Sequence, residues 1–258
     1  MTTASKVIIT ILSIVTAIAI IIGVSMYIFR GFSFGTRSTR TVEGNVSLEG
    51  DLSEIIVEAD ISEVKIRTGS EFSVAYSVPE ALEPKVSLKN GTLEVSSLSS
   101  MNLSFGNMNF DNYIIITIPE DSELARVSVD VDAGDIDLSE LNVSKLQVTV
   151  DAGNMDLKKI SATRIEIDAD AGNVELRDCN TDSLKIDVDA GNVDLYDSTI
   201  GTINAEVDAG NIESHNCKID SGTVDADLGN IDLGGEIGDV SAHASLGNTH
   251  VDKNKKTA

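Results

Sequence analysis

The chain has 258 residues, enough for one large all-β domain or two small ones with a buried core. Its formal net charge of −23 leaves no basic stripe that could neutralise phosphates, which excludes nucleic acid as a partner. A hydrophobic fraction of 41% is too high for a disordered chain, and 4% aromatic residues without Trp argue against stacking on sugars or bases.

An uncharged apolar run lies between Lys6 and Arg30; it begins at Val7 and ends at Phe29. It is long enough to cross a bilayer as one helix, so residues 1–30 are predicted to be a membrane anchor. A cleaved signal peptide is the alternative, because Ala17-Ile18-Ala19 has the spacing of a cleavage site. Charges on both flanks leave the orientation open. We expect a single-pass protein of the cell membrane whose large domain is extracytoplasmic.

Residues 31–41 are rich in Gly, Ser, Thr and Arg and are predicted to be a linker. Residues 42–119 carry short alternating runs of apolar and polar residues that predict an irregular β region without a strict repeat. Asn90-Gly91 separates two of these runs and indicates a tight hairpin turn. The expected strands are residues 45–48, 54–58, 63–67, 72–78, 85–88, 92–96 and 113–118.

From residue 120 the chain repeats itself. The sequence Asp132-Ala133-Gly134-Asp135-Ile136-Asp137-Leu138 recurs with its glycine at 134, 153, 172, 191, 210 and 229, and a divergent copy contains Gly247. A fixed period of 19 residues predicts stacked structural units. We therefore expect seven rungs over residues 120–251, followed by a disordered basic tail at 252–258.

We number the positions of each unit from Glu120, so that Gly134 is position 15; Gly247 is aligned with it in the last unit. Positions 8, 10 and 12 are apolar, and a second apolar pair follows the Ala-Gly turn at positions 17 and 19. This pattern predicts a strand, a turn and a second strand. Such a unit cannot bury a core alone, so the fold class is predicted to be all-β, a single-stranded parallel β-solenoid (β-helix) with 19-residue rungs. The Ala at position 14 is expected to line a thin core.

These features make the chain similar to the LiaG-like putative-adhesin family. The resemblance rests on the apolar N-terminal run, the irregular strands, Tyr113-Ile114-Ile115-Ile116-Thr117-Ile118-Pro119 and the repeats of the form V-D-A-G-N-V-D-L. It covers residues 42–251. It implies a β-solenoid domain of unknown function on microbial surface proteins, and it supplies no catalytic residues.

Three positions of the unit, 11, 13 and 18, are mostly acidic. Stacking places like carboxylates on neighbouring rungs, at a cost of about 0.9 kcal/mol per pair in bulk water. One interpretation is a solvated face that tolerates this repulsion. The other is that Ca²⁺, the one cofactor considered, bridges the rows through oxygen ligands. The candidate metal ligands are the position-13 aspartates Asp132, Asp151, Asp170, Asp189, Asp208 and Asp227.

Asparagines at position 16 are expected to hydrogen-bond along the axis as a ladder. Cys179 and Cys217 share position 3, two rungs and about 9–10 Å apart, which is beyond the reach of a disulfide. Leu141 and Ile160 occupy the same position, so two buried thiols are predicted. His243 and His250 replace acidic residues in the last rung. They either relieve repulsion there or form a metal site with Asp225 and Asp232. His215 is assigned to a loop without a role.

The sequence predicts a membrane-anchored, non-catalytic structural or interaction module, adhesin-like or envelope-associated, whose partners are envelope polymers or surface proteins. A polysaccharide-cleaving enzyme would need two carboxylates in different environments, whereas these aspartates recur identically on every rung. A Ca²⁺-dependent binder of envelope polymers is the main alternative.

Overall fold

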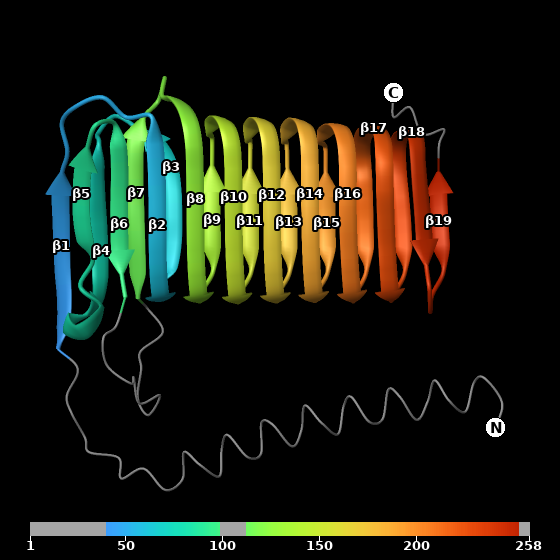
Figure 1. Ribbon diagram of the computed structural model, residues 1–258, viewed down its shortest axis with the longest axis horizontal. Coiled ribbons are helices and arrows are strands. Elements are labelled where there is room, and N and C mark those ends of the chain that lie inside the picture. Colours follow the sequence, from blue (N-terminus) through green and yellow to red (C-terminus); the bar gives the residue numbers. More distant parts are fainter. Residues whose placement is uncertain (1–39, 99–111, 253–258) are drawn as a thin grey trace, which may run out of the picture. The chain divides into compact units, whose positions relative to one another are not determined.

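The computed structural model describes residues 40–98 and 112–252 (Figure 1). The predicted anchor at residues 1–30 lies outside the described residues, as do residues 31–39 of the predicted linker and 253–258 of the predicted tail. Within the described ranges, no helix has the length and apolar character needed to span a membrane.

The described chain from Glu123 onward is a parallel β-solenoid of about seven turns, as predicted. A typical turn has an 11-residue strand and a four-residue strand, such as β8 (Glu123–Ala133) followed by β9 (Ile136–Ser139). The turns that follow are β10 (Asn142–Ala152) with β11 (Met155–Lys158), β12 (Ser161–Ala171) with β13 (Val174–Arg177), β14 (Asn180–Ala190) with β15 (Val193–Tyr196), and then β16 (Thr199–Ala209), β17 (Ile212–Leu228), β18 (Ile231–Ala244) and β19 (Thr249–Asp252).

Each strand pairs in parallel with its equivalent one rung away, so identical positions stack. Val127 lies opposite Leu146, and Leu146 lies opposite Ile165, which confirms the 19-residue register. The register shifts between Ser214 and Cys217, after which Cys217 pairs with Gly235. The last rung is therefore one residue shorter.

The region expected to be irregular contains two further rungs of the same ladder. The strand β2 (Glu54–Ile61) pairs in parallel with β8, and β3 (Glu63–Gly69) pairs in parallel with β9. The strands β6 (Thr92–Ser97) and β7 (Tyr113–Pro119) then pair in parallel with β2 and β3. The segment between residues 54 and 66 is thus a rung inserted between the β6/β7 rung and the repeats.

Antiparallel strands cover the β6/β7 end of the stack. The strand β4 (Ser73–Pro79) pairs with β7, and β1 (Thr41–Ser47) pairs with β4. A 3₁₀ turn at Glu80–Leu82 buries Leu82, and β5 (Lys85–Lys89) forms a hairpin with β6. Asn90 and Gly91 make its two-residue turn with φ of 52° and 82°, which confirms the predicted hairpin.

The core is built from the positions that the sequence indicated and from one that it did not. Leu146, Val148 and Val150, at positions 8, 10 and 12, are fully buried, as are Met155 and Leu157 at positions 17 and 19 of the same rung. Leu141 is buried at position 3, where buried thiols were predicted, and Val143 is buried at position 5, which the sequence did not indicate. Exposed Ser144 and half-buried Lys145 follow position 5 and interrupt the alternation of the long strand. That break hid this third apolar segment from a period-two pattern.

The expectation that the position-14 alanines line the core is wrong. Ala152, Ala171, Ala190 and Ala209 are exposed. They follow position 13, which is also exposed, so the chain has already left the strand alternation at this corner. The tube is filled by Val, Ile and Leu side chains instead.

Candidate functional site

The asparagines of position 16 form a continuous hydrogen-bonded ladder, as predicted. The Oδ1 atom of Asn173 accepts from the backbone N–H of Asn192 (3.0 Å) and from its Nδ2 (3.1 Å). The same pair of bonds recurs on each rung from Asp135 to Asn230, and the backbone N–H of Asn248 ends the series. These side chains satisfy the corner backbone, so their role is structural.

Two acidic rows run along the outer face of the long strands. The position-11 row includes Asp130, Asp168 and Asp187, and the position-13 row is formed by the aspartates proposed above as metal ligands. All six of those aspartates are exposed. Glu58 pairs with Asp130, and Asp60 lies on the same rung between residues that pair with Val131 and Ala133. Both rows therefore extend onto β2, which the sequence reading missed.

The carboxylates of these rows raise one another's pKa. Burial raises the pKa of Asp208, and the neighbouring Asp189 and Asp227 raise it further. The pKa of Asp132 is likewise raised by burial and then by Asp60 and Asp151. Neighbouring carboxylates of the row thus disfavour one another's charged form.

The structure stacks the position-13 aspartates in one row along the solenoid axis, with one aspartate per rung. Calcium takes six to eight oxygen ligands in proteins, which one row of carboxylates does not supply alone. Across residues 40–98 and 112–252, no cluster of three or more His, Cys, Asp or Glu side chains is arranged to hold a metal ion. Bound Ca²⁺ would have to bridge adjacent rungs with water completing its shell.

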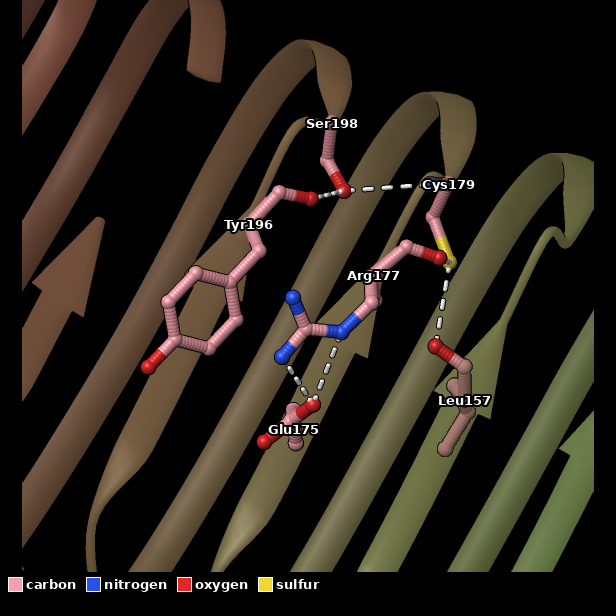
Figure 2. Close-up of polar contacts among 6 residues, drawn as sticks. All are labelled: Leu157, Glu175, Arg177, Cys179, Tyr196 and Ser198. Atoms are coloured by element: carbon pink, nitrogen blue, oxygen red, sulfur yellow. Dashed lines mark hydrogen bonds and ion pairs between the residues drawn. The ribbon is translucent and has the colours of Figure 1, made fainter. Parts of the chain in front are cut away.

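The face of the short strands carries the third acidic row, at position 18, beside a stack at position 1 (Figure 2). The Arg177 guanidinium lies over the Tyr196 ring, 4.3 Å from its centroid, and donates to Glu175 Oε1 at 2.6 Å. The Tyr196 and His215 rings stack with centroids 5.2 Å apart. The assignment of His215 to a loop is therefore wrong: it lies in β17, paired with Tyr196.

The pKa values of carboxyls in this third row are also raised. Burial raises the pKa of Asp194, and Glu213 and Glu175 add to the shift. Burial and then Glu175 raise the pKa of Asp156 in the same way. The short-strand face is thus negative but carries aromatic and cationic side chains at one edge.

Both cysteines are buried and free, which confirms the predicted pair of core thiols. The Cys179 thiol donates to the carbonyl oxygen of Leu157 at 3.4 Å (Figure 2). Ser198 occupies the same position on the rung between them, and its hydroxyl accepts from the Cys179 N–H at 3.1 Å. Burial raises the pKa of each thiol, so neither is an activated nucleophile.

The last rung places His243 opposite Asp225 and His250 opposite Asp232, as the alignment indicated. Both histidines are exposed. In the described part of the chain, neither belongs to a cluster of three potential metal ligands.

The fold and its rows define a class of protein, an acidic parallel β-solenoid with a capped first end. The chain belongs to the Toastrack DUF4097 family, whose model matches residues 52–257. No protein with a curated description matches it. The family confirms the resemblance seen in the repeats.

Solved structures of low sequence identity share the fold. A putative adhesin from Bacteroides fragilis superimposes with a TM-score of 0.59 at 17% identity, covering 83% of this chain and 98% of that chain. A putative adhesin from Parabacteroides distasonis gives a TM-score of 0.50 at 12% identity, with the same coverage of both chains.

Proposed function

We propose that this protein is a membrane-anchored, extracytoplasmic interaction module that contacts envelope polymers or surface proteins through its acidic rows. The position-13 aspartates carry the proposal. The recurrent Val, Ile, Leu, Gly and Asn residues of the unit fill the core, permit close stacking or bond the corners, whereas these aspartates are exposed on each of the first six rungs. Costly side chains retained at exposed, equivalent positions point to a contact with another molecule.

A non-catalytic role is favoured by the uniformity of the rows. Acid–base catalysis by two carboxyls requires environments that push their pKa values apart. Here the carboxyls with a resolved shift in the three rows are all raised: Asp132, Asp156, Asp168, Asp194 and Asp208. The adhesin descriptions of the two structural neighbours agree with an interaction role for this fold.

Surface exposure can be tested with a single new cysteine. Thr163 is exposed, so Thr163→Cys in the full chain should react with a membrane-impermeant maleimide on intact cells. The parent protein provides the matched control, because Cys179 and Cys217 are 2% and 1% exposed and should remain unlabelled. Labelling of Thr163→Cys only after lysis would contradict an extracytoplasmic domain.

The second candidate, Ca²⁺-dependent binding, is favoured by the repulsion between neighbouring position-13 aspartates. If Ca²⁺ bridges adjacent rungs, millimolar Ca²⁺ should raise the unfolding temperature and Mg²⁺ should not match it, because Mg²⁺ demands a stricter octahedral shell. Replacement of Asp132, Asp170 and Asp208 by Asn should abolish the response, since it leaves no adjacent pair among the repeat aspartates. An unfolding temperature unaffected by Ca²⁺ would rule out this candidate and leave the interaction module standing.

A further inference from the structure

The two ends of the described solenoid differ. At the first end, β4 and β5 pair antiparallel with β7 and β6, β1 pairs antiparallel with β4, and these strands cover the stack (Figure 1). At the other end, the second half of β18 and β19 form the last rung, and within the described residues each pairs only with the rung before it. The core residues of this rung, Val240, Ala242, Ala244 and Val251, are only partly buried.

The backbone of the last rung offers hydrogen-bonding groups in the axial direction. In a parallel ladder, successive residues bond alternately to the strands on either side. Ser245 donates its N–H to the carbonyl oxygen of Ala226 on the preceding rung at 2.8 Å. The backbone N–H and C=O groups of Ala242 and Ala244 therefore point toward the open side, while their side chains belong to the core. The N–H of Ala244 is satisfied locally by the Thr249 hydroxyl at 3.1 Å. A sheet edge of this kind readily pairs with another strand.

All three acidic rows stop at this rung. His243 stands at position 11, Ser245 at position 13 and His250 at position 18, where earlier rungs have mostly Asp or Glu. Position 14 changes from Ala to Leu over the same stretch, and Leu228 and Leu246 are 42% and 51% exposed. The end is therefore less negative and more apolar than the rest of the stack.

This change of charge indicates which partner fits. A basic partner would be attracted by acidic rows continued to the end, so nothing would favour their loss. A second copy of this chain, with a net charge of −23, would be repelled by them. We propose that the last rung is a self-association surface, at which two copies meet end to end around a two-fold axis with their β18 edges paired antiparallel.

The size of the surface predicts a reversible dimer. A rung of 18 residues, the spacing from Gly229 to Gly247, has a path of about 60 Å at about 3.3 Å per residue. It encloses an end face of a few hundred Å², below the roughly 800 Å² per partner of a standard interface. The dimer should therefore dissociate on dilution.

Sedimentation of the full chain in detergent micelles tests this proposal. The parent should show a concentration-dependent monomer–dimer equilibrium. Replacing His243, Ser245 and His250 with Asp extends the rows to the joint and should weaken the dimer at least tenfold, while the matched Asn triple variant retains it. A contribution of the N-terminal segment to association is common to all three proteins and cancels in the comparison.

A separate substitution tests the pairing of the two β18 edges. Ala242→Pro removes an N–H that faces the open side and should abolish the dimer without loss of the far-UV circular dichroism signal, because edge strands tolerate Pro. A parent that stays monomeric at high concentration, or an Asp variant that associates as tightly as the parent, would overturn the proposal. So would a series of higher oligomers, which indicates head-to-tail stacking.

Discussion

Replacing Gly172 with Ala is expected to destabilise the protein by about 3 kcal/mol or more, a large part of the stability of an ordinary domain. A Cβ atom there would overlap the backbone carbonyl of Gly153 on the preceding rung, and the φ of 152° disfavours a side chain. The Gly172 N–H also donates to Ala190 of the next rung at 3.0 Å, so the corner cannot move away without losing a ladder bond.

The matched control is Gly234→Ala. Its Cβ would lie 3.1 Å from the carbonyl oxygen of Ser214, a tight contact that a small shift relieves, and we expect a cost of less than about 1 kcal/mol. Urea denaturation followed by circular dichroism measures both variants. Equal free energies of unfolding for the two would show that close stacking at position 15 is not what the repeat requires.

Mild acidification should stabilise the protein, against the usual behaviour of globular domains. The pKa of Asp132, Asp168 and Asp208 is raised by burial and by neighbouring carboxylates above the ordinary Asp value of 3.8. The folded protein then binds protons more tightly than the unfolded chain. Its free energy of unfolding therefore falls as pH rises through the folded-state pKa values, and it recovers as pH is lowered.

Two carboxyls act in the opposite direction. Hydrogen bonds from Lys159 to Glu140 and from Lys145 to Glu166 lower the pKa of each glutamate below its ordinary value of 4.5. Their stabilising contribution is lost only as pH falls through those lower values. As pH falls from neutral towards the ordinary Glu value of 4.5, the raised aspartates should dominate. We expect the unfolding temperature to rise over this range, and also with added NaCl at neutral pH because salt screens the rows. A steady fall in unfolding temperature on acidification would contradict this.

Most of the solenoid could be predicted because its sequence repeats with a fixed period. Gly134 and its equivalents set the register, and the apolar residues at positions 8, 10 and 12 set the inward face. The inserted rung was missed because Ser62 occupies the place of the corner glycine: a Cβ on Gly134 would overlap the Ser62 carbonyl. Only strand pairing reveals that equivalence.

A second corner of each rung was not predicted from the sequence, for a similar reason. Glu140, Lys159, Asp178, Asp197 and Asn216 all adopt φ between 48° and 60°, at position 2 of their rungs. Left-handed backbone is usually marked by Gly, and none of these five residues is Gly. The candidate surface was better predicted than the corners, since exposure of alternating aspartates follows directly from strand alternation. The stacking of His215 on Tyr196 depends on the register at β17, which only the folded structure reveals.

The role of the aspartates is tested most directly by the unfolding temperature of the Asp132, Asp170 and Asp208→Asn variant at neutral pH without divalent cations. Replacing alternate members separates the remaining position-13 aspartates of the repeats by two rungs, about 9–10 Å. The control is a triple variant with Asn at three exposed sites outside the row, Asp51, Asp121 and Asp239. It changes the net charge by the same amount. If the row is retained for binding rather than folding, the row variant should unfold at a higher temperature than both the parent and the control. A lower unfolding temperature would mean that the aspartates hold the fold together.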